Sequence, residues 1–431
     1  MYSYEVGNLG YYYNPEISAK PSRIRKIWAA GSYYPGDLGE QIDLSIGIPY
    51  VSPELDNKIE EIIRDNKCNF TTRKSPYASA EGHEWFRETV AKFYSERIDY
   101  SVKPEMVLPG VGSLSIVVCS VMATTSPGKE VLYPSPGFGQ YYVDPIRVFG
   151  AKPVPYYANK ETLKCDAESI ISKFTDKTSL VILNSPCNPT GMEQPIETLK
   201  AVLEVAAEKK IHVLNDGVYG GWETRYNTKN ESFSLFNLLD KSSEASIIET
   251  FSGSKARLSP GRRAGFAICS NPDLRARIIG GQFMVLASVP HSAMESVCTL
   301  FTDSRMDEIC RKYKEKLIKA KKYVTEAFGS ITGVKIIEPE GAIYAFPNVE
   351  GMGLSATEFV KIGIRAGVRM VEGWAFIPEP SKNPNHADGN HYVRLCFAAL
   401  PEPEHAKEAA ERVKTVLETE KMREEALQID I

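Results

Sequence analysis

Residues 252–266, SGSKARLSPGRRAGF, combine one amine with several guanidinium groups among small residues. Lys255 is followed by three arginines, the last of which is Arg263, eight positions further on. A lysine amine becomes a nucleophile when burial or neighbouring cations lower its pKa, and an arginine fork binds phosphate. The segment could instead be a solvated basic loop or a patch that binds nucleic acid. The rest of the sequence must decide between these three hypotheses.

Further polar residues follow apolar runs that we expect to be strands. Ligands in doubly wound sheets bind beyond the carboxyl ends of the strands, so residues at those ends meet in space. Each group alone is a weak signal, but the groups occur together and all lie at predicted strand ends. They are Asn188 after residues 179–185, Asp216 and Tyr219 at the end of residues 211–216, and Gly112, Ser113 and Leu114 after residues 106–110.

These residues suit a phosphorylated aromatic aldehyde with a ring nitrogen. Amides at a helix N-terminus, hydroxyl groups and an arginine fork bind phosphate. A lysine that reacts with the aldehyde, together with an aspartate beside the ring nitrogen, is the signature of pyridoxal 5′-phosphate, which we therefore predict as the cofactor. The predicted phosphate ligands are Ser113, Leu114, Ser252, Ser254 and Arg263, the ring ligands are Asp216, Asn188 and Tyr219, and Phe138 offers an aromatic face.

The elements that must position these residues alternate between strands and helices. Helical patterns such as residues 196–210 separate short apolar runs, which favours an α/β domain. Runs that are apolar almost throughout suit a mostly parallel, seven-stranded sheet that is covered on both faces. The predicted strands are residues 106–110, 130–135, 152–157, 179–185, 211–216, 246–252 and 264–270.

Beyond about residue 300 the pattern indicates a smaller α+β domain. It contains a long charged helix over residues 306–328, a terminal helix from about Glu402 and an exposed loop at residues 379–390. The strand-like segments are residues 334–339, 342–347, 367–373 and 391–398. We expect residues 1–50 to form an N-terminal arm and part of the small domain, residues 51–305 the large cofactor-binding domain, and residues 306–431 the small C-terminal domain.

Composition argues against several classes of function. The 431 residues carry a net charge of −4, which disfavours a nucleic-acid binder. No apolar run reaches the length of a membrane span, and the N-terminus lacks a signal-peptide pattern. The eight cysteines form neither a C-x-x-C motif nor a metal-ligand cluster, which is typical of reduced thiols. We expect a cytoplasmic protein without a bound metal, a membrane partner or a nucleic-acid partner.

The motifs resemble those of the class I/II aminotransferases, which are fold-type I enzymes that depend on pyridoxal phosphate. Residues 252–266 resemble the family's S-x-S-K-x-x-x-x-P-G-x-R-x-G block. The resemblance extends from about Arg23 to the last helix. It also includes NPTG (188–191), D-x-x-Y (216–219), YVRLCFA (392–398), DLSIGIP (43–49) and YASAEGHEWFR (77–87).

The resemblance implies a role for each matching residue. Lys255 would hold the cofactor as an imine and move a proton during the reaction, with Asp216 at the pyridine nitrogen and Phe138 stacked on the ring. Asn188 and Tyr219 would bind the ring's phenolic oxygen. The phosphate would be held by Gly112, Ser113, Leu114, Ser252, Ser254 and Arg263, and the substrate by Arg394, Asn188 and the backbone at Gly47.

The family also implies a homodimer with shared active sites, because Tyr77 would reach the phosphate of the partner subunit's cofactor. The implied reaction moves an amino group between an amino acid and a 2-oxo acid. A lyase, cyclase, decarboxylase or oxidase with the same fold and cofactor is the alternative. A non-catalytic effector-binding domain is disfavoured because Lys255 is present. The motif residues do not determine which substrate side chain is accepted.

Several positions depart from the family's usual pattern. Gly217 follows Asp216 where a glutamate is common, and Cys187 stands where small or polar residues are usual. We expect Glu372 and Trp374 to shape the side-chain pocket. The tyrosine-rich stretches at residues 10–16 and 29–37 would cover the active site or pack in the dimer. No role is assigned to Arg257 and Arg262, which we expect to face solvent or the subunit interface.

Overall fold

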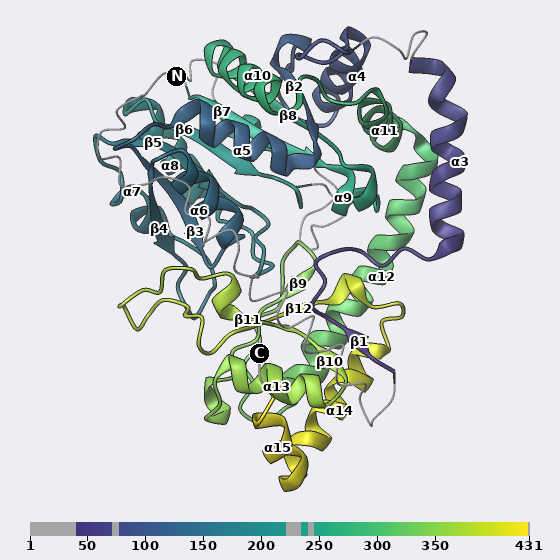
Figure 1. Ribbon diagram of the computed structural model, residues 1–431, viewed down its shortest axis with the longest axis vertical. Coiled ribbons are helices and arrows are strands. Elements are labelled where there is room, and N and C mark those ends of the chain that lie inside the picture. The colour runs from purple at the N-terminus through teal and green to yellow at the C-terminus, as the bar shows by residue number, and fades with distance from the viewer. Residues whose placement is uncertain (1–39, 71–76, 221–233, 240–244, 430–431) are drawn as a thin grey trace, which may run out of the picture.

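The computed structural model describes residues 40–70, 77–220, 234–239 and 245–429 (Figure 1). Both tyrosine-rich stretches lie outside the described residues. The large sheet has seven strands in the order β2-β8-β7-β6-β5-β3-β4. Strand β8 runs in the direction opposite to the other six. The strands are β2 (Val107–Val111), β3 (Glu130–Ser135), β4 (Lys152–Tyr157), β5 (Thr178–Leu183), β6 (His212–Asp216), β7 (Ile247–Ser252) and β8 (Ala264–Cys269).

All seven predicted strands are confirmed, because the apolar runs lie in a sheet with both faces covered. Along β5, Leu180 and Ile182 pack on one face, and Val181 and Leu183 pack on the other. A strand that is buried on both sides needs apolar residues at consecutive positions. Helices α5 (Gly112–Thr124), α6 (Gly139–Val148) and α10 (Pro272–Leu286) cover the first face, and α4 (Glu84–Ser95), α8 (Ile196–Glu208) and α11 (His291–Thr302) cover the second.

Two smaller sheets lie below the large one in Figure 1. Strand β1 (Ile42–Asp43) pairs in parallel with β10 (Val368–Arg369), so residues near the start of the described chain join the C-terminal region. Strands β11 (Val371–Glu372), β12 (Val393–Cys396) and β9 (Tyr344–Ala345) form an antiparallel sheet. Helices α13 (Ala356–Arg365), α14 (His405–Glu418) and α15 (Glu420–Leu427) accompany them. The domain boundaries at residues 50 and 305 stay a prediction.

The predicted strand at residues 334–339 is wrong. Within it only Lys335 pairs, through a single bridge to Asn348. The chain then turns toward the NPTG segment, where the backbone N–H groups of Glu340 and Gly341 both donate to the carbonyl oxygen of Gly191. Within the predicted strand, the backbone N–H of Val334 donates to the Ile331 carbonyl oxygen in a turn rather than to a neighbouring strand. Among the described residues, no helix has the length and apolar character needed to cross a membrane.

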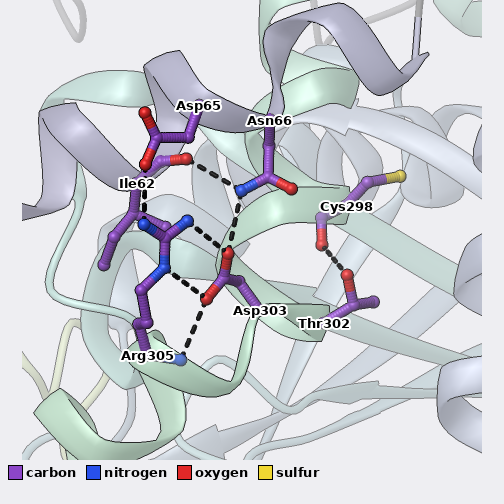
Figure 2. A network of polar contacts seen from close by, with 7 residues as sticks. All are labelled: Ile62, Asp65, Asn66, Cys298, Thr302, Asp303 and Arg305. Atoms are coloured by element: carbon purple, nitrogen blue, oxygen red, sulfur yellow. Dashed lines mark hydrogen bonds and ion pairs between the residues drawn. The ribbon is translucent and has the colours of Figure 1, made fainter.

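Helix α12 (Ser304–Gly329) is the long charged helix that the sequence predicts, and it runs from beside the large sheet down to the small ones (Figure 1). Asp303 caps its N-terminus by accepting a hydrogen bond from the backbone N–H of Arg305 at 2.9 Å. Figure 2 shows the same carboxylate between Arg305 and Asn66 of α3 (Pro53–Phe70), whose amide donates to it at 2.8 Å. Arg305 also pairs with Asp65 at 2.7 Å. Asp303 thereby joins α12 to α3.

We predict that Asp303→Ala destabilises the chain by about 0.5–2 kcal/mol, the usual cost of losing an N-cap. The hydrogen bond from Arg305 is the main cause that lowers the pKa of Asp303 to about 2. A folded-state pKa below the unfolded value gives stability that is complete above about pH 4 and is lost as the pH falls toward about 2. Urea unfolding should therefore separate the variant from the wild type clearly at about pH 7 and less at about pH 3.

The neighbouring Thr302→Ala is the matched control, because among the described residues the Thr302 hydroxyl bonds only within its own helix, to the carbonyl oxygen of Cys298. An equal loss of stability in both variants would contradict the role assigned to Asp303.

Candidate active site

Lys255 lies just beyond the carboxyl end of β7, in the four-residue helix α9 (Gly253–Ala256). Its Nζ donates to the carbonyl oxygen of Gly47 at 2.5 Å. Burial of the amine lowers the pKa of Lys255 to about 8; the positive charges of Arg394 and Arg263 act in the same direction, and the Cys396 thiol opposes them. A lysine with this pKa has a substantial neutral fraction near neutral pH, as a nucleophile or proton acceptor requires.

A group of small polar residues and one arginine lies next to Lys255. The Ser252 hydroxyl donates to Ser254 Oγ at 2.9 Å, and Arg263 Nη1 donates to the same Ser254 oxygen at 3.3 Å. Gly112 has a φ of +67°, and a Cβ at this position would lie 2.6 Å from Arg263 Nη2. Only glycine permits this close approach at the start of α5, where Ser113 and Leu114 follow. These donors could bind an anion.

The backbone conformation of Arg263 directs its side chain back toward Ser252 and Ser254. The chain forms a short turn at Pro260–Arg262, after which Arg263 has a φ of +51°. A left-handed conformation is uncommon for a residue with a side chain, and such residues are enriched at functional sites. The backbone N–H of Gly112 donates to the Arg263 carbonyl oxygen at 2.6 Å, which fixes the turn. Arg263 is nevertheless exposed, so this side of the site is open in one chain.

Asp216 is buried at the end of β6 and is held by two hydroxyl groups. Tyr142 donates to its Oδ2 at 2.9 Å, and Thr250 donates to its Oδ1 at 3.1 Å. Burial is the largest influence and raises the pKa of Asp216, against the lowering effect of its hydrogen bonds. Asn184 joins the neighbouring strand end, because its amide donates to the Asp216 carbonyl oxygen at 2.7 Å. The motifs identified neither Tyr142 nor Thr250, since nothing in the sequence links them to Asp216.

Arg394 is buried on β12 and reaches the same region from the small sheet. Its Nη1 donates to Asn188 Oδ1 at 3.2 Å and its Nη2 to the Ser45 carbonyl oxygen at 2.5 Å. The guanidinium lies over two aromatic rings, 4.5 Å from the centre of Tyr344 and 4.7 Å from that of Phe376. Within the described residues its buried Nε has no hydrogen-bond partner. The predicted neighbours Arg394, Asn188 and Gly47 therefore do lie together.

Tyr219 lies with this group, while two other predicted residues are less closely associated with it. The Tyr219 hydroxyl is 2.7 Å from that of Tyr344, a residue that no motif identified. Phe138 is half-buried and stacks on Tyr141 with ring centres 4.1 Å apart. Tyr77 is 89% exposed, so one chain alone does not bury it against the other residues.

The expectation that Arg257 faces solvent or a subunit interface is wrong. Arg257 is only 2% exposed, donates to Asp307 of α12 at 2.8 Å and lies over the Phe301 ring. The ion pair and the ring contact compensate for the removal of the charge from water. Arg262 remains partly exposed and forms an ion pair with Glu60.

The other unusual positions have packing roles within the described residues. Glu372 accepts a hydrogen bond from Thr357 Oγ1 at 2.5 Å, and the Trp374 ring lies against Gly389. Phe376, two residues further on, is the one that contacts Arg394. Cys187 is buried and lies 3.7 Å from the Pro136 carbonyl oxygen. A Cβ on Gly217 would lie 2.9 Å from the Thr250 carbonyl oxygen, which explains the absence of a larger residue there.

The chain is similar to known aminotransferases over nearly its whole length. An aspartate aminotransferase of Pyrococcus horikoshii is 26% identical over 411 residues, which cover 93% of this chain and 96% of that protein. Aromatic-amino-acid aminotransferase 2 of Thermococcus litoralis is 28% identical, and the match covers 93% of this chain and 97% of that protein.

In the part of the chain that the structure describes, no group of three or more His, Cys, Asp or Glu residues could hold a metal ion.

Solved structures agree with these relatives. An aromatic aminotransferase from Pyrococcus horikoshii has a TM-score of 0.76 at 25% identity, covering 92% of this chain and 100% of that one. An alanine aminotransferase from Pyrococcus furiosus has the same fold, with a TM-score of 0.80, 24% identity and coverage of 94% and 100%. The model of the family "Aminotransferase class I and II" matches residues 39–413. The chain therefore belongs to the class I and II aminotransferases, as its motifs predict.

Proposed function

We propose that this aminotransferase binds pyridoxal 5′-phosphate at Lys255 and uses it to move an amino group between an amino acid and a 2-oxo acid. One observation carries the proposal. Lys255, Arg263 and Arg394 lie close enough for the two arginines to lower the pKa of Lys255, yet none of the three forms an ion pair with a described carboxylate. Three cations without an anionic partner suit a site that receives a phosphate and a substrate carboxylate.

The residues present fit this cofactor. Ser252, Ser254 and Arg263, with the backbone that begins α5 at Gly112, Ser113 and Leu114, would hold the phosphate. Asp216 would accept a hydrogen bond from the protonated ring nitrogen, and Tyr142 and Thr250 already orient its carboxylate. Asn188 and Tyr219 would bind the phenolic oxygen, and Phe138 would stack on the ring. When bound, the cofactor supplies an electron sink for the carbon that loses its proton.

The protein's own groups would bind the substrate and move the proton. Arg394 would hold the α-carboxylate through its guanidinium, which lies over the Tyr344 and Phe376 rings. Lys255, with a pKa of about 8, would take the proton from the substrate carbon and return it at the neighbouring position. The Gly47 carbonyl oxygen accepts from Lys255 and so keeps the free amine inside the site. The aromatic rings would exclude water from this step.

A homodimer would complete the site. Arg263 and Tyr77 are exposed in one chain, and apolar Phe283, Met284 and Val285 are exposed near the end of α10. A second copy that covers these residues would bring its Tyr77 to the phosphate side of the first. Seven cysteines are free and buried, which suits a reducing compartment, and we place the enzyme in the cytoplasm: Cys119, Cys165, Cys187, Cys269, Cys298, Cys310 and Cys396.

The first test is the role of Lys255. Borohydride reduction of the cofactor-loaded protein should attach the cofactor to the peptide that contains Lys255, detected by mass spectrometry. Lys255→Ala should abolish this attachment and lower amino transfer by at least about 100-fold, because it removes the acid–base group. Lys209→Ala changes an exposed lysine and is the matched control. Attachment at another lysine, or no uptake of cofactor, would refute the proposal.

The products distinguish amino transfer from the alternative chemistries. Single amino acids, added to the loaded enzyme without a 2-oxo acid, should each yield one equivalent of 2-oxo acid and leave the amino group on the cofactor. Release of ammonia, carbon dioxide or a cyclised product would favour a lyase, decarboxylase, oxidase or cyclase.

The second test is the pH dependence of cofactor uptake. Only the neutral amine of Lys255 attacks the aldehyde, so the rate of uptake should rise about tenfold per pH unit below its pKa of about 8 and level off above it. Arg394→Gln removes a charge that lowers this pKa, so its profile should shift to higher pH. Stopped-flow absorbance measures both profiles. A profile that is flat between about pH 6 and about pH 9 would contradict the assignment.

A further inference from the structure

Tyr344 is a buried tyrosine at the centre of the site that the motifs did not identify. It lies on β9 and is 1% exposed. Strand β9 pairs with β12, where Cys396 is opposite Tyr344 and Arg394 lies two residues earlier. The short antiparallel sheet therefore places Tyr344 beside the arginine that would bind the substrate.

The side chain of Tyr344 contacts three parts of the site at once. Its hydroxyl is 2.7 Å from the Tyr219 hydroxyl and donates to the Gly47 carbonyl oxygen at 3.3 Å. The Arg394 guanidinium lies over the Tyr344 ring, 4.5 Å from the ring centre. A Cβ on Gly47 would lie 2.7 Å from the Tyr344 oxygen, so the backbone there closes directly over the phenol. Tyr219 follows β6 of the large sheet, Arg394 lies on β12 of the small sheet, and Tyr344 contacts both.

We propose that Tyr344 is a positioning residue whose hydroxyl orients Tyr219 and whose ring orients Arg394. The inference rests on the proposed function, because it concerns the cofactor's phenolic oxygen and the substrate's carboxylate. The two actions belong to different atoms of one side chain and can therefore be separated by substitution. Tyr344→Phe removes only the hydroxyl, and Tyr344→Leu removes the hydroxyl and the ring.

The hydroxyl acts through the direction of its hydrogen bonds. A phenol has one proton, and Tyr344 gives its proton to Gly47, so Tyr219 donates to Tyr344 in this arrangement. When Tyr219 instead donates to the ring oxygen of the cofactor, Tyr344 turns its proton toward Tyr219. A donor that itself accepts a hydrogen bond donates more strongly. Lys255 continues to donate to the Gly47 carbonyl oxygen, which keeps that group satisfied.

The ring acts on Arg394 together with Phe376, which faces the guanidinium at 4.7 Å. Phe376→Leu is the matched control, because it removes an aromatic contact from Arg394 and leaves the Tyr344 hydroxyl in place. Loss of one cation–π contact should hold the guanidinium less firmly and weaken carboxylate binding about threefold.

The experiment measures two quantities on the loaded enzyme: the pH midpoint of the bound cofactor's visible absorbance, and the KM for an amino acid. A stronger bond to the ring oxygen favours its ionised form, so Tyr344→Phe should raise the midpoint by about 0.5 pH unit and leave KM within about twofold. Phe376→Leu should raise KM about threefold without moving the midpoint, and Tyr344→Leu should do both.

The action through Tyr219 has its own test. In a Tyr219→Phe background, adding Tyr344→Phe should move the midpoint no further, because the hydroxyl then has no phenol to orient. An independent shift of the same size in both backgrounds would overturn the inference. If Tyr344→Phe does not fold, Gly47→Ala replaces it, since its Cβ displaces the phenol oxygen and should raise the midpoint in the same direction.

The failure of this inference is distinguishable from failure of the proposed function. If the wild type takes up the cofactor at Lys255 and transfers amino groups, but Tyr344→Phe leaves the midpoint unchanged or changes only KM, Tyr344 has no orienting role. If the wild type does not bind the cofactor at all, the proposed function fails first.

Discussion

The positive charges of Lys255, Arg263 and Arg394 lie near one another and repel, the Lys255 amine and Arg394 being buried, and no described carboxylate pairs with any of the three. Such an arrangement costs stability unless a bound anion offsets it. Burial of the Lys255 amine lowers its pKa to about 8, and the charges of Arg394 and Arg263 act in the same direction. The guanidinium groups cannot respond in this way, because arginine stays protonated. The unpaired guanidinium groups therefore suit the site to anions, and burial together with their charge makes its lysine reactive.

The fold maintains this arrangement by bringing each charge from a different element. Lys255 follows β7, Arg263 precedes β8 and Arg394 lies on β12 of the small sheet. The buried carboxylate of Asp216 accepts hydrogen bonds from the Tyr142 and Thr250 hydroxyls. Helix α12 runs from beside the large sheet down to the small ones (Figure 1), and its Asp303 cap joins it to α3.

Hydrogen bonds between side chains and the backbone then connect the two halves. The Gly47 carbonyl oxygen accepts from Lys255 and from Tyr344, and Tyr344 in turn contacts Tyr219 and Arg394. Asn188 links the NPTG turn to Arg394. The residues that would touch the cofactor and those that would touch the substrate thus form one connected set, which explains how a change at one of them could reach the others.

The sequence by itself determined the seven strands of the large sheet, the long helix, and the block with Lys255 and Arg263, because a covered parallel sheet needs apolar runs and its ligands need polar residues at the strand ends. It also pointed to Asn188, Tyr219 and Arg394, and the structure connects these three residues through the Arg394 guanidinium and Tyr344. Only the tertiary structure revealed Tyr142, Thr250, Tyr344 and Phe376, and it alone corrected the burial of Arg257 and the missing strand at residues 334–339. The reason is physical: periodicity and spacing record what each segment buries, whereas a hydrogen bond between distant segments depends on how the elements pack.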